Sequence, residues 1–510
     1  MTAQQTTPHL PSAPYSSAAG PASGAADTVQ VFLASTALEV VFLAAGIDAG
    51  CYDSAVAPAV IRTTAQPRPA ARARERILLL SDNAAVLEQA TPLHSALGLS
   101  SLMARFDRVL TLNESITPHH PNTWAPAEAD LPMLQRLLRS HWELGTSDVE
   151  LIVESPQVNP AIALARIFSE SLIRVSADGL MSYGPTRSRL PLGMQQRMTT
   201  LHYAPLAPDL QPRLLHETGI VPVPVPLEAV SDVIAEVREN AADMIDAAAA
   251  RLTGERTGII LGQYCAALGL ITESEESELH CQMAEAVLSA GCKTVAFKPH
   301  PAAPTASTAA LAAHVTAHGG RFVVIDTPVI AEALITAIGP AIVVSAFSTS
   351  LMLVAQLYGC QTAAVGSRLL LQRLRPYENS NRIPLTIIDQ FAHRGHADID
   401  PQAHGDESMN LQDLVDAVSY CMQPRLLPAF RQRTSDLLAR LDDDTRGLYF
   451  TRGTLSALDL PGRLPRRSHP RTTARRAGRL GSDYLLYRAR RAIRRSRTRR
   501  AAERQKRRQR

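Results

Sequence analysis

A lysine and a histidine stand among prolines at the end of an apolar run that reads TVAFKPHP, from Thr294 to Pro301. Proline fixes its own φ and favours extended geometry in the residue before it, so the backbone around Lys298 and His300 is predicted to be stiff. Ligands of open α/β sheets bind at the carboxyl ends of strands, where this stretch is expected to lie. It is predicted to form one wall of a sugar-nucleotide site. A plain strand end before a proline-rich loop is the alternative.

Three hydroxyl residues open a predicted helix in the stretch AIVVSAFSTSLMLVAQLYG, residues 341–359. A buried strand is expected to end at Ser345, and a short turn of Ser348, Thr349 and Ser350 follows it. Hydroxyls and backbone N–H groups at a helix N-terminus favour a bound anion, and the helix dipole adds to this. An ordinary N-cap would need only one of them. In a parallel sheet this turn and KPHP share one edge, so together they are predicted to hold a nucleotide phosphate.

A carboxylate follows another predicted strand in the stretch VSADGLMSYGPTR, residues 175–187. Asp178 precedes Gly179, so the chain can turn sharply there and leave the carboxylate projecting from the sheet edge. A carboxylate in that place could act as general base on an acceptor hydroxyl. A plain Asp-Gly turn is the commoner meaning of this dipeptide, and these residues alone leave it open.

Two further loops are expected to face the same cleft. Gly262 ends the first strand of the second predicted domain, in LGQYCAALGL, and Gln263 follows it on the donor side. Ser35 and Thr36 lie between the first predicted strand and its helix, and we assign them to the acceptor side. The chain has no GxxxxGKS, GxGxxG or GxSxG motif. Its six cysteines are scattered without a CxxC pair, so no metal site is predicted.

Apolar runs that alternate with helical spacing predict βαβ units and a parallel sheet in each half of the chain. The strands expected in the first half are 28–36, 76–82, 106–114, 149–155 and 171–180. Those expected in the second half are 258–262, 294–297, 321–326 and 341–345. Proline-rich sequence over 205–226 is expected to connect the halves irregularly, followed by one long helix over 227–252. Helices at 410–422 and 426–441 are expected to pack back across the domain junction.

Length and composition indicate a globular chain of two domains. Its 510 residues exceed what one core can serve, and a hydrophobic content of 45% is ordinary. An uninterrupted apolar run of about 18 residues is missing, so no transmembrane helix is predicted. The expected order is a disordered leader over 1–26, an acceptor domain over 27–225, a linker helix with a nucleotide-sugar domain over 226–460, and a basic tail over 461–510.

Arginine clusters dominate the end of the chain. From Arg463 onward there are 20 Lys and Arg residues against Asp483 and Glu503, so this tail carries +18 and the remainder −14. Within it YLLYRARRAIRR, residues 484–495, would place much of its apolar content on one side of a helix. Such a helix is typical of a segment that binds an anionic membrane surface. Nucleic-acid binding through counterion release is a less favoured alternative, and a basic tail without a dedicated partner is another.

Four of these stretches together resemble the bacterial α-2,8-polysialyltransferase family: LGQ at 261–263, FKPHP at 297–301, the Ser-Thr turn at 348–349 and ADGLMSYGP at 177–185. The resemblance runs across most of residues 28–370. It implies an α/β fold of the GT-B type, with two Rossmann-like domains facing across a cleft. It also implies an inverting, metal-independent glycosyltransferase that uses CMP-activated sialic acid as donor and needs no cofactor.

The family's acidic motif is two carboxylates followed by glycine, and here Ala177 stands in place of the first. The resemblance therefore gives the role of general base to Asp178 alone. It gives contact with the leaving CMP phosphate to His300, with Lys298 assisting. The residues assigned to the donor are Gly262, Gln263, Lys298, Pro301, Ser345, Ser348, Thr349 and Ser350, and those on the acceptor side are Gly179, Ser35 and Thr36.

The predicted function is transfer of sialic acid, or a related nonulosonic acid, from a CMP-sugar to a glycan acceptor in cell-surface or capsular polysaccharide synthesis. The protein is expected to be cytoplasmic and bound peripherally to the inner face of the cell membrane through its basic tail. Nucleic acid is not an expected partner. The alternatives are another GT-B enzyme, such as a sugar-nucleotide epimerase or a teichoic-acid-type polymerase, and a non-catalytic relative that binds nucleotide or glycan.

Overall fold

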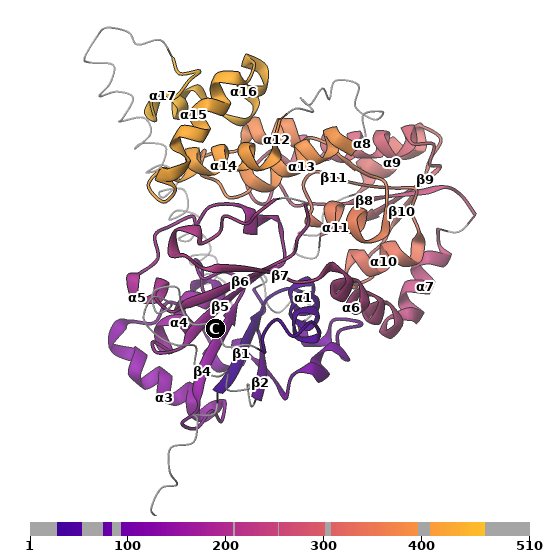
Figure 1. Cartoon of the computed structure of the whole chain (residues 1–510). Helices are drawn as coiled ribbons and strands as arrows, with labels where there is room; N and C mark the ends of the chain where they lie inside the picture. Colours follow the sequence, from indigo (N-terminus) through magenta and orange to yellow (C-terminus); the bar gives the residue numbers. More distant parts are fainter. Residues whose placement is uncertain are drawn as a thin grey trace, which may run out of the picture.

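The computed structural model of the chain contains two α/β units, each built on a parallel sheet (Figure 1). The prediction of an α/β protein with two Rossmann-like domains is confirmed. The structure describes residues 28–53, 75–83, 93–207, 210–252, 254–300, 308–395 and 409–464. The predicted leader, Pro301 and nearly all of the predicted basic tail lie outside these ranges.

The first sheet has seven strands in the order β3-β2-β1-β4-β5-β6-β7. Its strands are β1 (Thr28–Ala34), β2 (Glu75–Leu80), β3 (Arg108–Thr111), β4 (Asp148–Val153), β5 (Leu172–Ala177), β6 (Met198–Tyr203) and β7 (Val221–Pro224). All neighbouring strands pair in parallel. The chain adds strands outward from β1 on one side and from β4 on the other, so the strand order reverses between β1 and β4. That reversal is where open α/β sheets bind ligands.

Two strands of this sheet differ from the prediction. The proline-rich stretch 205–226 is predicted to be irregular, yet it contains β7, and β6 forms just before it. Strand β7 reads VPVP and pairs with β6 from Val221 opposite Thr200 to Pro224 opposite Tyr203. Proline cannot donate to a ladder, but an edge strand needs only one bonded side, and β7 is the edge of this sheet. The prediction of irregular structure is therefore wrong for these residues.

Helices cover both faces of this sheet. They are α1 (Ala37–Asp48), α2 (Leu112–Ile116), α3 (Leu131–His141), α4 (Ala161–Ile167) and α5 (Leu192–Gln195). Helix α1 is buried continuously from Glu39 to Ile47, so it forms the centre of a core rather than an amphipathic surface helix. Its first turn begins directly after β1 and therefore lies at the carboxyl edge of the sheet.

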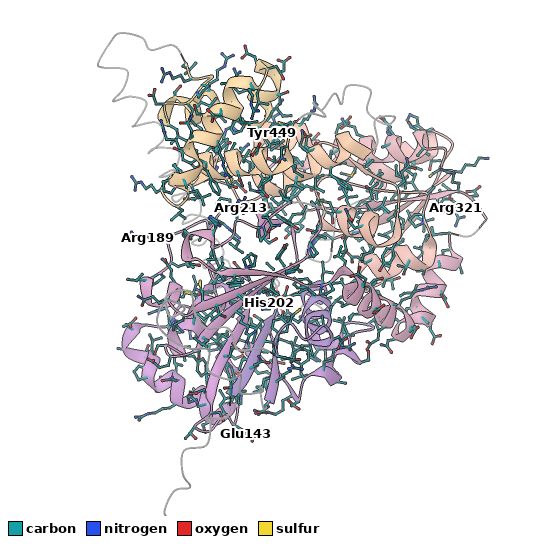
Figure 2. All side chains as sticks on the ribbon, in the orientation of Figure 1. Glu143, Arg189, His202, Arg213, Arg321 and Tyr449 are labelled. Carbon is teal, nitrogen blue, oxygen red and sulfur yellow. The ribbon has the colours of Figure 1, made fainter. Side chains whose placement is uncertain are left out.

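A buried polar network ties the middle strands together below that edge. The Arg174 guanidinium on β5 donates from Nε to Glu150 Oε1 on β4 over 2.8 Å, and Gln30 on β1 donates to Glu150 Oε2 over 2.8 Å. On β6, His202 Nε2 lies 2.9 Å from the Thr200 hydroxyl, near the centre of the unit in Figure 2. Buried polar groups cost free energy unless they are paired, so this network favours one alignment of these strands.

The second sheet has five strands in the order β10-β9-β8-β11-β12. They are β8 (Thr257–Leu261), β9 (Thr294–Lys298), β10 (Arg321–Val324), β11 (Ile342–Ser345) and β12 (Thr362–Ala364). The strand order reverses between β8 and β11, as it does between β1 and β4 in the first sheet. The helices around it are α8 (Glu273–Ser289), α9 (Ala309–Ala317), α10 (Ala331–Ile338), α11 (Thr349–Tyr358), α12 (Ser367–Arg373) and α13 (Arg382–Gly395).

Two helices connect the sheets, where the sequence predicts one over 227–252. Helix α6 (Leu227–Asn240) ends at Ala241, whose φ of −111° and ψ of 18° interrupt the helix before α7 (Ala242–Ala250). Figure 1 shows α6 at the junction of the two units, and it packs against α1 on one side and against α10 on the other.

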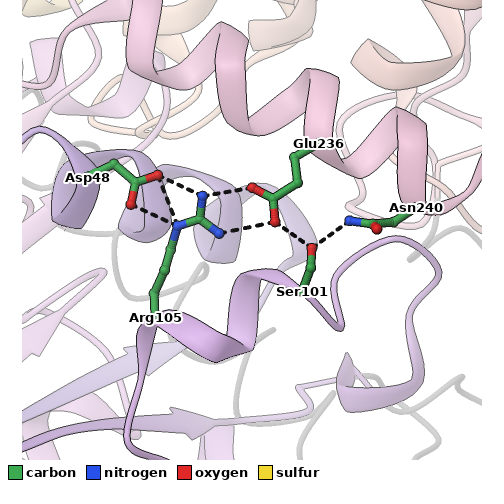
Figure 3. Close-up of polar contacts among 5 residues, drawn as sticks. All are labelled: Asp48, Ser101, Arg105, Glu236 and Asn240. Carbon is green, nitrogen blue, oxygen red and sulfur yellow. Dashed lines mark hydrogen bonds and ion pairs between the residues drawn. The ribbon is translucent and has the colours of Figure 1, made fainter.

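An ion-pair network fixes α6 to the first unit (Figure 3). Arg105 donates to Asp48 at the end of α1 over 2.7 Å and to Glu236 of α6 over 2.7 Å. The Ser101 hydroxyl donates to Glu236 over 2.5 Å and accepts from the Asn240 amide. A network of this kind is more persistent than an isolated surface pair, so it holds α6 against the first unit.

Part of the C-terminal helical region contacts the first unit, as predicted. The helices of this region are α14 (Leu411–Met422), α15 (Arg431–Arg440), α16 (Asp443–Tyr449) and α17 (Arg452–Ala457). Arg213 of the first unit, labelled in Figure 2, donates to both carboxylate oxygens of Asp416 on α14, over 2.5 and 3.0 Å. Its guanidinium lies over the Phe430 ring. Every helix in the described ranges is too short or too polar to cross a bilayer.

Candidate functional site

Most of the predicted site residues lie at the carboxyl edges of the two sheets, close to where each strand order reverses. In the first sheet Ser35 directly follows β1, and Asp178 directly follows β5. In the second sheet Gly262 follows β8, and Ser348 lies at the start of α11 after β11. This placement follows from parallel pairing, because parallel strands bring all their carboxyl ends to one edge.

Direct contact joins the acidic turn of the first unit to the hydroxyl turn of the second. The backbone N–H of Leu180 donates to Thr349 Oγ1 over 3.4 Å. A Cβ placed on Gly179 would lie 3.2 Å from the same oxygen, so glycine permits the close approach of α11. Asp178 and Thr349, which lie far apart in the sequence, are thus brought together across the boundary of the two units.

Asp178 is a half-buried carboxyl group with an unusual proton affinity. Burial and the negative charge of Glu154 raise its pKa to about 7, and Glu332 of the second unit adds to the shift. Low polarity and like charge both disfavour the ionised carboxylate. A carboxyl group with a pKa near neutrality exchanges protons readily at physiological pH, which suits a general base.

The predicted acceptor residues Ser35 and Thr36 hold the acidic edge in place. Ser35 donates from its backbone N–H to Glu154 Oε1 over 2.8 Å and from its hydroxyl to Glu154 Oε2 over 2.6 Å. Thr36 caps α1, and its hydroxyl accepts from the Glu39 N–H over 3.0 Å. Both side chains thus bond to protein in the described structure, and their predicted role toward an acceptor stays a prediction.

Two carboxyl groups of this edge were not predicted from the sequence. Glu154 directly follows β4, and burial raises its pKa despite the two bonds from Ser35. Glu39 lies in the first turn of α1 with 1% of its surface exposed. Burial and the charges of Asp178 and Glu154 hold its pKa well above the ordinary value. The sequence does contain a signal for Glu154, since this residue ends the run VELIVE at a predicted strand terminus. It contains none for Glu39, which lies in an apolar helix.

The hydroxyls of the second unit have protein partners. Ser348 caps α11 by accepting from the Ser350 N–H over 3.3 Å, and Ser350 donates its hydroxyl to Glu332 over 2.7 Å. Ser345 is fully buried, and its hydroxyl donates to the Leu261 carbonyl over 2.8 Å. Ser345 therefore links β11 to β8, while Ser348 and Thr349 lie at the helix N-terminus as predicted from the sequence.

Lys298 and His300 differ in their surroundings. The Lys298 ammonium is buried and donates to the Thr327 carbonyl over 2.9 Å. Burial lowers its pKa to about 8, although Glu332 opposes the shift. His300 is exposed, and its ring centroid lies 4.6 Å from that of Tyr264. Partial desolvation lowers the pKa of His300 below the ordinary value. His300 is therefore mainly neutral at pH 7 and can donate one hydrogen bond.

The loop after β8 supports the hydroxyl turn. Gln263 Oε1 accepts from the Phe347 N–H over 3.0 Å, which fixes the backbone just before α11. A Cβ on Gly262 would lie 2.7 Å from the Phe297 ring, so this position has room only for glycine. Pro301, also assigned to the donor, lies outside the described residues. Within the described ranges, no group of three or more His, Cys, Asp or Glu side chains could hold a metal ion.

Comparison with known proteins decides the family. The family model of alpha-2,8-polysialyltransferase (POLYST) matches residues 54–367, which is more than half of the chain. The chain belongs to this family. It is accordingly a glycosyltransferase of the sialyltransferase kind. The matched range contains Glu154, Asp178, His300 and Thr349, whereas Ser35 precedes it.

Similar solved structures share low sequence identity with this chain, and no curated protein matches it. A sialyltransferase from Photobacterium damsela has a TM-score of 0.34 and 10% identity, over 64% of this chain and 72% of that one. UGT2 of Phytolacca americana, solved with UDP-2-fluoro-glucose and pterostilbene, has a TM-score of 0.34 and 10% identity, over 82% and 98%. MurG of Acinetobacter baumannii has a TM-score of 0.32 and 8% identity, over 83% and 98%.

Proposed function

We propose that this protein transfers sialic acid, or a related nonulosonic acid, from a CMP-sugar to a glycan hydroxyl, with inversion at the anomeric carbon and without a metal. The observation that carries the proposal is the contact of the Asp178–Leu180 turn with Thr349 at the N-terminus of α11. It places a carboxyl group with a pKa near 7 beside the end of a helix that favours anions. Transfer of a sugar from a CMP-sugar requires a base for the acceptor hydroxyl close to a site for the donor phosphate.

In the proposed reaction the acceptor oxygen attacks the anomeric carbon as Asp178 removes its proton. A new bond forms between the carbon and the acceptor oxygen, while the bond between that carbon and the phosphate oxygen breaks. The electron pair of the broken bond stays on the phosphate of CMP. Attack from the side opposite the leaving group inverts the anomeric carbon.

The second unit would stabilise the leaving phosphate. Helix α11 is ten residues long, and its N-terminal dipole attracts negative charge. The neutral His300 imidazole can donate a hydrogen bond to the phosphate, whose charge would also raise the pKa of the ring toward protonation. Donors aimed at developing charge commonly contribute a few kcal/mol each to lowering a barrier.

A nucleotide panel tests the donor. CMP is expected to raise the melting temperature of the purified protein, whereas UDP and CDP-glycerol are expected to leave it unchanged. Release of CMP from CMP-sialic acid, with and without an oligosialic acceptor, then measures turnover. Stabilisation by UDP alone would indicate a different GT-B enzyme, and CMP binding without turnover would indicate a non-catalytic relative.

The cellular role proposed from the sequence is synthesis of a surface or capsular glycan at the inner face of the membrane. Its support is the charge of the tail from Arg463 onward, which carries +18. Co-sedimentation with vesicles of anionic and of neutral lipid, using the full chain and a chain ending at residue 462, tests this role. Equal sedimentation of the two chains with anionic vesicles would contradict it.

A further inference from the structure

Three carboxyl groups from different elements meet at the carboxyl edge of the first sheet. Glu39 comes from α1, Glu154 follows β4, and Asp178 follows β5. Two of them raise the pKa of a neighbour: Glu154 raises that of Asp178, and Glu154 and Asp178 both raise that of Glu39. Position 177, where the resemblance to the family leads us to expect a second carboxylate, is an alanine whose methyl group cannot take part in this cluster.

The pairing of β4 with β5 explains how Glu154 reaches the site. Val153 lies opposite Val175 in the parallel ladder, so the next residue, Glu154, comes opposite Ser176. Adjacent strands lie about 4.8 Å apart, and long side chains reach diagonal neighbours across that distance. Glu154 is therefore within range of the turn that carries Asp178. It reaches this turn from the end of the neighbouring strand, whereas residue 177 would reach it as the preceding residue in the chain.

Glu154 is also held rigidly. Ser35 bonds to both of its carboxylate oxygens, through a backbone N–H and a hydroxyl. A side chain fixed by two bonds has little freedom to swing into solvent when its charge becomes unfavourable. Its carboxyl group is thus a fixed part of the surroundings of Asp178.

Glu39 adds an independent sign that the cluster is not ordinary packing. Its Oε1 is buried and has no hydrogen-bond partner among the described residues. Buried polar atoms without partners are rare in folded proteins and are found at functional sites. A neutral Glu39 beneath two acids at a sheet edge is consistent with a site that exchanges protons.

We propose that Glu154, held by Ser35, replaces the missing carboxylate of position 177 and acts as the positioning residue that keeps Asp178 a strong base. This inference rests on the proposed function, because it assumes that Asp178 takes the acceptor proton. That proton leaves the acceptor oxygen for Asp178 and later passes to water, so the cluster ends each turnover unchanged. The charged groups that face Asp178 are Glu154, Glu39 and, from the second unit, Glu332.

The pH profile of kcat/KM tests the proposal. Wild-type activity is expected to rise with pH through an apparent pKa near 7, because the base must be ionised. Glu154→Gln removes a negative charge, so the rise should move to lower pH by about one unit, and the plateau should fall several-fold, by at most about tenfold, as the base weakens. Glu154→Asp should restore the wild-type position of the rise. Glu170→Gln, on the exposed surface near the start of β5, is the matched control and should change neither.

The outcomes separate the two proposals. If Asp178→Asn keeps full activity, the proposed function has lost its base, whatever Glu154 does. If Asp178→Asn is inactive but Glu154→Gln keeps the wild-type pH profile, only the inference about Glu154 is wrong. A loss of activity in Glu154→Gln with an unmoved profile would mean a purely structural role and would also overturn it.

A second measurement does not depend on turnover. Raised carboxyl pKa values make the folded state lose stability as pH rises from about 4 toward 8. The fall in melting temperature over that range should be smaller in Glu154→Gln and in Asp178→Asn than in wild type. In the double variant the two reductions should not add, because each removes the same repulsion. Additive reductions would overturn the proposed coupling.

Discussion

The two sheet edges that meet in this protein carry side chains of opposite charge type, acidic on the first sheet and basic on the second, and burial shifts the pKa values of both sets. The edge of the first sheet holds Glu39, Glu154 and Asp178, and burial raises the pKa of each. The edge of the second holds Lys298 and His300, and burial lowers the pKa of both. Desolvation therefore moves acids and bases toward neutrality from opposite directions. Burial brings the pKa of Asp178 to about 7 and that of Lys298 to about 8, so these two groups exchange protons near neutral pH.

We assign the general base to the edge of the first sheet. Asp178→Asn tests this assignment and has the largest expected effect on kcat. Asparagine cannot accept the acceptor proton, so kcat should fall by about 10²–10⁴-fold. The KM for the CMP-sugar should change little, because the donor phosphate is assigned to the second unit. Steady-state release of CMP measures both constants.

The control for this variant is Asp130→Asn, since Asp130 is exposed and its side chain makes no capping bond to α3. It should behave as wild type. A rise in KM with unchanged kcat in Asp178→Asn would reverse the assignment of the two edges.

Removal of a hydrogen-bond donor from the edge of the second sheet should lower kcat less than the loss of Asp178 does. His300→Ala is expected to lower kcat by about 10²-fold, as loss of one well-placed hydrogen-bond donor does in other enzymes. A donor without a phosphate, such as a 4-nitrophenyl sialoside, should lose much less, because it offers His300 no phosphate oxygen to bond. His119→Ala, an exposed histidine of the first unit, is the matched control. Equal losses with both donors would show that His300 does not serve the leaving group.

A methyl group added at Gly179 would strain the contact between the two sheet edges. In Gly179→Ala the new Cβ would lie 3.2 Å from Thr349 Oγ1, a closer approach than most Cβ atoms make. A loss of about tenfold in kcat is expected, because a displacement of about 1 Å at a reacting group costs up to about 10²-fold. The loss of melting temperature in Gly179→Ala should be smaller when Thr349→Ala is also present. Equal losses in both backgrounds would place the strain elsewhere.

The smallest expected effect concerns stability. Glu39 has a raised pKa in the folded protein, so its contribution to stability is complete below its unfolded pKa of about 4.3 and is lost as pH rises. Glu39→Gln mimics the neutral acid and avoids that loss. It should melt about 2–4 °C above wild type at pH 8, the shift that about 1 kcal/mol produces in a domain of this size. At pH 4 the two proteins should melt together, and a uniform decrease at both values would contradict the prediction.

Much of the fold was readable from the sequence because buried parallel strands are nearly continuous apolar runs. Every strand expected from such a run forms. The failures have local causes: β7 contains two prolines, β12 has only three residues, and the interruption at Ala241 leaves no mark in an alanine-rich helix.

The placement of candidate site residues could be predicted only where a polar side chain directly follows a predicted strand. KPHP, the Ser348 turn and Asp178 all met that condition. Glu39 did not, because it belongs to a helix, and its proximity to Asp178 depends on packing. Glu154 met the condition, but its proximity to Asp178 depends on which strands are neighbours. The order β1-β4-β5 cannot be predicted from any one segment of the sequence.

The position of Glu154 has a consequence for how this family can vary. Two adjacent parallel strands end at one edge, so an acid lost after one strand can be supplied after the other without rebuilding the fold. Related proteins with a carboxylate matching position 177 should be free to carry a neutral residue at the position matching Glu154. Proteins that, like this one, have a small residue at 177 should keep the acid at 154. An alignment of the family would show this as an exchange between two positions 23 residues apart in the numbering of this chain.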